Sequence, residues 1–242
     1  MKILLIADDL TGALDSSAAF AARGLRVVCA LAPGVVQGAV RQDPDVLAVT
    51  TNSREINEDQ AAARVGQVLE ALGSTPEWRG AILFKKIDSR LKGHVSVEVA
   101  QLARLRPGLM ACPAIPRLGR VVKDGALAGM GVEAPIPVAE RLGLAPAQVI
   151  DAQDDAGIDA ALCGVALADT LFVGAAGLAE ALARRLVPDA PGPQPVPLHA
   201  PHSSPSARAI RSRWRSLPRW IRLPRRTVQC QTPPAGNSAP CR

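Results

Sequence analysis

Two adjacent carboxylates, Asp8 and Asp9, follow the apolar run 3–7 near the start of the chain and precede Thr11. The run has the length of a buried strand, and ligands of open α/β sheets bind beyond the carboxyl ends of such strands. Two carboxylates at this position therefore indicate a polar binding site. The alternative is that one of them, or Thr11, only caps the helix that follows.

A second polar segment lies at the end of the predicted strand 45–51 and contains Asn52 and Arg54. An amide and a guanidinium at the end of a strand can bind a ligand, and a guanidinium binds a carboxylate through two parallel hydrogen bonds. Taken alone, the segment also fits an ordinary turn.

The third segment is the most charged, and it lies between the apolar run 81–84 and Gly93. Its polar residues are Lys85, Lys86, Asp88, Ser89, Arg90 and Lys92. Successive side chains of a strand point to opposite faces, so at least one of the two adjacent lysines must face the covered side of the sheet or its mouth. Burial of an unpaired lysine there would cost much free energy. Three charged loops of both signs at one sheet edge predict a pocket for a small anion that carries hydroxyl groups.

The elements that must position these loops alternate between strand-like runs and segments of helical period, which predicts an α/β fold with a parallel sheet and helices on both faces. The clearest helix is 58–72, with Asn57 as its N-cap and Gly73 just beyond its end. We expect strands at 2–7, 26–31, 45–51, 81–87, 109–112, 148–151 and 170–174, and further helices at 12–23, 94–105, 155–165 and 177–187.

Composition limits the classes of function. The chain has 242 residues, of which 48% are hydrophobic and only 2% aromatic, so base stacking on aromatic rings is not its mode of binding. Its five cysteines lack metal-ligand spacing, and we assign no metal ligands to the protein. The chain shows neither a signal peptide nor a membrane-spanning run, so we expect a cytoplasmic protein without a membrane or nucleic-acid partner.

The net charge of +6 is unevenly distributed along the chain. Residues 199–242 contain nine Arg and seven Pro but no Asp, Glu or Lys, so this tail carries +9 and the preceding residues −3. We expect one domain over 1–187, a Pro-rich linker over 188–198, and an unfolded tail over 199–242. The abrupt change of composition is typical of a shifted reading frame in a GC-rich gene, which we favour, although a genuine basic tail would look similar.

Four segments in this order and spacing resemble the four-carbon acid sugar kinases, also called tetronate or 3-oxo-tetronate kinases. They are Ala7-Asp8-Asp9-Leu10-Thr11-Gly12-Ala13, Lys85-Lys86-Ile87-Asp88-Ser89 with Gly93, Pro113-Ala114-Ile115-Pro116 with Gly119-Arg120, and Gly174-Ala175-Ala176-Gly177-Leu178-Ala179. The resemblance covers the N-terminal, substrate-binding domain of that family. Lys92 stands where the family usually has Arg, and Ala175 where Ser is common.

The resemblance implies a small acid sugar as the ligand and specific roles for the charged residues. Arg54, Lys86 and Lys92 would hold its carboxylate. Asp8, Asp9 and Asp88 would bind its hydroxyl groups. Asp9 would take the proton of the acceptor hydroxyl. Thr11, Asn52 and Ser89 complete the expected substrate site.

The phosphoryl donor implied by the resemblance is ATP with Mg²⁺, bound in the family by a C-terminal domain. The chain shows no Gly-rich phosphate-binding motif, and the arginine-rich tail stands where that domain would begin. Two functions stay open: a kinase of which this chain carries the acceptor domain, inactive by itself, and a truncated acid-sugar binder without catalysis. The sequence does not determine the oligomeric state, and a homodimer is one of the states that it allows.

Overall fold

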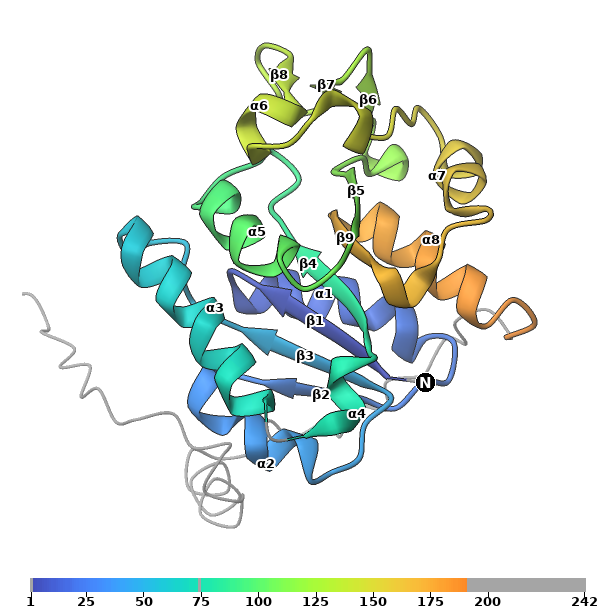
Figure 1. The fold of residues 1–242 in the computed structure, drawn as a ribbon. Coiled ribbons are helices and arrows are strands. Elements are labelled where there is room, and N and C mark those ends of the chain that lie inside the picture. Colours follow the sequence, from blue (N-terminus) through green and yellow to red (C-terminus); the bar gives the residue numbers. More distant parts are fainter. Residues whose placement is uncertain (1, 74, 191–242) are drawn as a thin grey trace, which may run out of the picture. The chain divides into compact units, whose positions relative to one another are not determined.

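A six-stranded parallel sheet forms the centre of the computed structural model, which describes residues 2–73 and 75–190 (Figure 1). The strands lie in the order β2-β3-β1-β4-β9-β5. Their bounds are β1 (Ile3–Ala7), β2 (Val27–Ala30), β3 (Val46–Thr50), β4 (Ile82–Lys86), β5 (Gly108–Cys112) and β9 (Thr170–Gly174). The α/β fold with a parallel sheet, predicted from the sequence, is confirmed.

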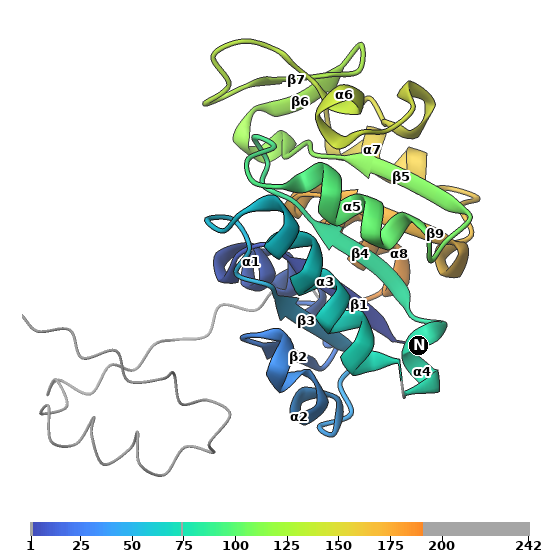
Figure 2. The ribbon, with the colours of Figure 1, turned by 60° about the vertical axis from the view of Figure 1, so that its left-hand side comes forward.

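Helices cover both faces of the sheet (Figures 1 and 2). One face carries α1 (Leu10–Ala21) and α8 (Ala176–Leu186), and the other carries α3 (Glu58–Leu72) and α5 (Val95–Ala103). The bounds of α3 are those predicted, and the Asn57 side chain accepts a hydrogen bond from the backbone N–H of Gln60 at 2.9 Å. Helix α1 begins at Leu10, before the predicted residue 12, because the side chain of Asp9 caps it.

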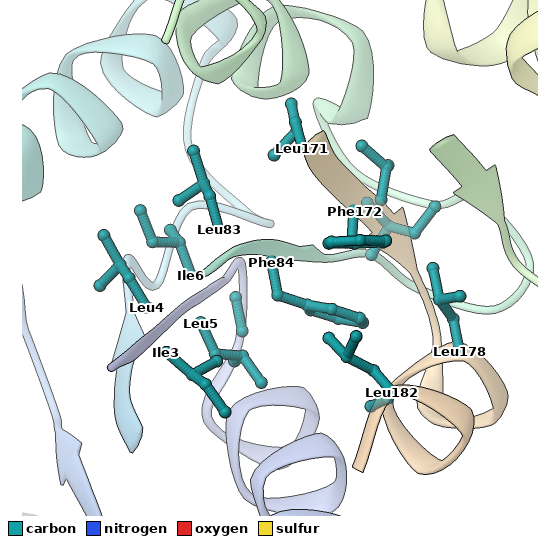
Figure 3. Packing of buried hydrophobic residues seen from close by; sticks show 14 of the residues in the cluster. Ile3, Leu4, Leu5, Ile6, Leu83, Phe84, Leu171, Phe172, Leu178 and Leu182 are labelled. Carbon is teal, nitrogen blue, oxygen red and sulfur yellow. The ribbon is translucent and has the colours of Figure 1, made fainter. Parts of the chain in front are cut away.

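The core is aliphatic, and it divides between the two faces by strand alternation (Figure 3). Ile3, Leu5 and Phe84 point toward α1 and α8, whereas Leu4 and Leu83 point toward α3 and α5. In the parallel register Leu4 pairs with Leu83, and Leu5 with Phe84. The strands β1, β3, β4 and β9 are buried on both faces, which explains why they read as largely apolar runs, whereas the edge strands β2 and β5 are partly exposed.

A smaller antiparallel sheet lies in the segment between β5 and β9. Its strands are β6 (Arg120–Lys123), β7 (Ala126–Gly129) and β8 (Ile136–Pro137), and α6 (Val138–Leu142) follows. The strand predicted at 148–151 is wrong, because Pro146–Gln148 forms a 3-10 turn and only a single bridge joins Val149 to Ala111. The small sheet was not predicted because strands of two to four residues carry too little alternation to be recognised.

The remaining elements of the described chain are short. They are α2 (Val36–Val40), α4 (Pro76–Arg79), α7 (Asp155–Leu162) and the 3-10 turns Pro33–Val35, Pro116–Leu118 and Leu167–Asp169. None of the helices in the described part of the chain has both the length and the apolar character needed to cross a membrane. The predicted tail 199–242 lies outside the described residues, as does the predicted linker from residue 191 onward, so the domain assignment stays a prediction.

Candidate functional site

The three polar loops meet at the carboxyl edge of the central sheet. The loop after β1 leads to α1 on one face, whereas the loops after β3 and β4 lead toward α3 and α5 on the other face (Figure 2). Since β1 lies between β3 and β4, the loops diverge around it to the two faces of the sheet. Such a reversal is where ligands of open α/β sheets bind.

Arg54 is the centre of the polar cluster. Its Nε and Nη2 donate to the two carboxylate oxygens of Asp8 at 2.8 and 3.1 Å. Its Nη1 lies 3.0 Å from Asp9 Oδ2, and its Nη2 lies 3.8 Å from Asp88 Oδ2. Burial works against the charge of Arg54, but the hydrogen bond and the charge of Asp8, with Asp9 and Asp88, outweigh it and raise the pKa of Arg54. One guanidinium therefore joins the carboxylates of two loops.

Asp9 has two partners at once. Its Oδ1 accepts a hydrogen bond from the backbone N–H of Gly12 at 2.8 Å, which caps α1, and its Oδ2 pairs with Arg54. The capping interpretation and the binding interpretation of this residue are therefore compatible. Asp8 is only 1% exposed, whereas the Asp9 side chain is 29% exposed and faces the mouth of the cluster.

Lys86 is the second cation of the cluster. Its side chain is buried, and a Cβ added at Gly12 would lie 2.8 Å from the Lys86 ammonium and 2.6 Å from Asp9 Oδ1. The absence of a side chain at Gly12 therefore leaves room for both charged groups. Burial lowers the pKa of Lys86, and the charges of Asp8, Asp9, Asp15 and Asp88 partly oppose this effect.

Gly93 brings the third loop against the first. Its φ of +87° is one that a residue with a side chain rarely adopts, and a Cβ there would lie 3.2 Å from Asp8 Oδ2. The close approach places the backbone of the loop beside the buried carboxylate.

The loop 88–93 is held by backbone and side-chain contacts. The Asp88 Oδ1 atom accepts from the backbone N–H groups of Arg90 at 2.9 Å and of Lys92 at 3.5 Å. Ser89 Oγ accepts a 2.6 Å hydrogen bond from Arg120, a residue of β6. The Lys92 side chain is exposed. Sequence reasoning did not identify Arg120 as a site residue, although the Gly119-Arg120 pair of the third resembling segment was a signal for it.

Two of the expected binding residues lie apart from the Arg54 cluster. The Asn52 side chain donates to the Leu31 carbonyl at 3.0 Å and accepts from the Thr50 hydroxyl at 3.1 Å, so it is turned toward the end of β2. Thr11 is exposed in the first turn of α1. The structure therefore brings together Asp8, Asp9, Arg54, Lys86 and Asp88.

An apolar cavity of about 310 Å³ lies elsewhere in the described part of the chain. Its lining includes Leu4 and Leu83, near the starts of their strands, together with Leu72, Trp78 and Arg106. It is therefore at the opposite edge of the sheet from the charged loops. Its lining is mostly apolar, in contrast to the charged side chains at the carboxyl edge.

Three carboxylates and two cations therefore lie together at the switch point of a parallel α/β sheet. A family model described as "Sugar-binding N-terminal domain" matches residues 3–141, more than half of the chain. Among curated proteins, the chain is 33% identical over 224 residues to a D-threonate kinase of Bordetella bronchiseptica, covering 74% of this chain and 54% of that protein. It is 33% identical over 137 residues to a D-erythronate kinase of Heliobacterium modesticaldum, covering 52% of this chain and 29% of that protein.

The chain belongs to the four-carbon acid sugar kinase family, of which it carries the N-terminal domain. It spans about half the length of the D-threonate kinase that it matches. Among solved structures, it superposes with a TM-score of 0.65 and 30% identity on a protein from Bordetella bronchiseptica, covering 76% of this chain and 56% of that one. That protein is described as a domain of unknown function with bound citrate, in a domain-swapped dimer.

Proposed function

We propose that this chain supplies the acceptor-binding part of an ATP-dependent kinase that phosphorylates a four-carbon acid sugar, a tetronate or a 3-oxo-tetronate. The observation that carries the proposal is the joint placement of Arg54 and Lys86 with three aspartates at the carboxyl edge of the sheet. The similar proteins named D-threonate and D-erythronate kinase support the substrate class. Citrate bound to the similar solved structure supports an affinity for hydroxylated carboxylic acids.

The charges of the cluster suit a ligand that has both a carboxylate and hydroxyl groups. Three carboxylates can accept hydrogen bonds from hydroxyl groups, and the two cations can bind the carboxylate of the acid. Asp8 holds Arg54 through two hydrogen bonds and is buried, so this pair stays in place when a ligand enters. The ligand carboxylate would replace the more exposed Asp9 or Asp88 at the outer side of the guanidinium.

Lys92, Ser89, Thr11 and Asn52 are proposed to contact the ligand at the rim. The exposed Lys92 can reach a carboxylate from solvent, and the Ser89 hydroxyl is oriented by Arg120. Asn52 would need to release the Leu31 carbonyl before it could contact the ligand. We therefore expect substitution of Asn52 to weaken binding less than substitution of Lys86.

Asp9 is the proposed acceptor of the proton that leaves the reacting hydroxyl. Both of its oxygens are occupied, one by the Gly12 N–H and the other by Arg54, so Oδ2 must exchange Arg54 for the hydroxyl. Asp88 Oδ2 is 3.8 Å from Arg54 and is less engaged. If the chain turns over the acid, comparison of the rates of Asp9→Asn and Asp88→Asn separates the two carboxylates, because loss of a general base costs about 10²–10⁴-fold in rate.

The described residues do not fit a site for magnesium-ATP. They contain no group of three His, Cys, Asp or Glu side chains placed to hold a metal ion, and the three aspartates already face Arg54 and Lys86. We place the nucleotide site outside the described residues. If no nucleotide-binding domain works together with this chain, its function is the second candidate, an acid-sugar binder without catalysis.

Calorimetry with D-threonate, D-erythronate and citrate tests the binding proposal on the full chain. Asp9→Ala and Lys86→Ala should each lower the affinity by about 1–3 kcal/mol, because each leaves partners of the cluster unpaired. Asp59→Ala, on the exposed face of α3, is the matched control and should leave the affinity unchanged. Absence of binding to any of the three acids, or unchanged affinity in both site variants, would overturn the proposal.

A turnover assay with magnesium-ATP and the acid that binds tests our expectation that the chain is inactive by itself. A rate in the ordinary kinase range of about 1–100 s⁻¹ would show that the chain is a complete kinase, against our expectation that it is inactive by itself. Light scattering of the purified chain tests whether it forms a homodimer.

A further inference from the structure

We propose that a buried polar chain, formed by Lys85, Glu98, Ser53 and Thr51, positions Asp8 and Arg54 for acid binding. The four side chains come from β4, α5 and the loop after β3, and each is at most 1% exposed. None of the four faces the mouth of the site. The proposal rests on the proposed function and names its positioning residues.

The buried polar chain is continuous from the ion pair to the site. The Lys85 ammonium lies 2.8 Å from Glu98 Oε2, and the Ser53 hydroxyl contacts the other oxygen of the same carboxylate. The hydroxyls of Ser53 and Thr51 are 2.7 Å apart. The Thr51 hydroxyl lies 3.0 Å from the carbonyl oxygen of Ala7, the residue before Asp8.

Backbone hydrogen bonds tie the same residues to the first loop. The Ser53 N–H donates to the Asp8 carbonyl, and the Thr51 N–H donates to the Ala7 carbonyl, both at 2.9 Å. Ser53 directly precedes Arg54. The buried polar chain therefore holds both partners of the Asp8–Arg54 pair by their own backbones, with Glu98 as the link to α5 behind them.

Stability does not explain why this buried site is charged. Removing two charges from water costs free energy that their mutual attraction often fails to recover, and well-packed apolar residues in their place are often as stable or more so. Strand alternation adds a second consequence, because Lys85 faces α5 while Lys86 faces α1 and the aspartates. Glu98 thus compensates the lysine that points away from the site, and Lys86 remains the lysine that serves it.

The test is a pair of variants that separate binding from stability. Lys85→Met combined with Glu98→Leu replaces the ion pair by apolar side chains, and Ser53→Ala removes the link while keeping the ion pair. We expect the double variant to keep a thermal unfolding temperature at or above that of the wild type. Both variants should bind D-threonate about tenfold more weakly in calorimetry.

Ser17→Ala is the matched control, since Ser17 is also a buried serine but bonds only within its own helix, to the Leu14 carbonyl. It should leave D-threonate binding unchanged. Wild-type affinity in both the double variant and Ser53→Ala would overturn the proposal, because a merely structural role predicts that result.

If the wild type binds no tetronate, the proposed function is refuted. The positioning role can still be tested by a measurement that needs no ligand. The Arg54 Nε–H group donates to Asp8, so its NMR signal in the wild type should be shifted and protected from solvent exchange. In the double variant and in Ser53→Ala the signal should move toward that of a free arginine and exchange faster. An unchanged signal in both would refute the positioning role.

Discussion

Replacement of Arg54 by Met should destabilise the protein although the residue lies in a polar loop. The guanidinium makes two hydrogen bonds to Asp8, at 2.8 and 3.1 Å, and Asp8 is 1% exposed. Without Arg54, this carboxylate is left buried beside the desolvated Lys86 with neither of those hydrogen bonds. Met keeps the length and the apolar stem of the side chain, so the change removes mainly the charge and the donors.

The magnitude follows from the geometry. Hydrogen bonds to charged groups contribute about 1.5–3 kcal/mol, and breaking a fully buried pair costs about 3–5 kcal/mol. The Arg54 side chain is 24% exposed, so solvent screens part of this interaction. We expect a loss of about 2–3 kcal/mol in the free energy of unfolding.

Arg184→Met is the matched control. Arg184 makes the same two-pronged contact with Asp159, with a shortest distance of 2.8 Å, but the two side chains are 31% and 44% exposed. Exposed pairs contribute only about 0–1 kcal/mol, so this variant should lose no more than that. Urea denaturation of both variants measures the difference, with the slope of the transition expected to stay constant. Equal losses in the two variants would refute the argument that burial of the carboxylate makes the Arg54 pair important.

Three further predictions concern the backbone, pH and helix capping. Gly93→Ala should lower the free energy of unfolding by about 1–2 kcal/mol because of the positive φ, and it should also weaken acid binding because the added Cβ contacts Asp8. Gly24→Ala is the control, since Gly24 has a φ of +83° but no atom within 4 Å of the added Cβ, and it should lower stability alone. Urea denaturation measures the change in stability, and calorimetry measures the change in binding. Because the pKa of Lys86 is lowered in the folded protein, the unfolded chain binds more protons than the folded chain between that pKa and the usual 10.5. The stability of the wild type relative to Lys86→Met should therefore rise with pH in that window. A stability difference that does not change with pH would contradict this prediction. Asn57→Ala should cost about 1 kcal/mol in urea denaturation because the first turn of α3 loses its side-chain acceptor, and an unchanged midpoint would show that the cap is unimportant.

The sequence predicted most of the central sheet because its strands are buried on both faces. The run 171–174 is apolar without interruption, and the structure places β9 there. Helix α3 was predicted equally well, because its apolar positions repeat at helical spacing. The short strands β6 to β8 depend on contacts between segments, such as the 3.0 Å hydrogen bond from the Val138 N–H to the Gly125 carbonyl, which no local pattern contains.

In the candidate site, too, some features follow from neighbouring residues in the sequence and others depend on contacts between distant segments. The sequence by itself determined that Asp8, Asp9 and Asp88 follow buried strands and that Lys86 lies at the end of one. The carboxyl ends of parallel strands necessarily share one edge. Which side chains touch was decided only by the tertiary structure. Arg54 lies 46 positions from Asp8 along the chain, and Asn52, two residues away, is turned toward β2 instead.

Glu98 illustrates why the contacts could not be predicted. On α5 it has an ordinary helical position, and nothing in its neighbours along the chain indicates that it meets Lys85 and Ser53 beneath the site. Strand alternation required one of the two adjacent lysines to point into a covered face, but the identity of its partner depended on which helix covers that face. That choice follows from the strand order β1-β4-β9-β5 and from the route of the chain over the sheet, which arise from packing across the whole domain.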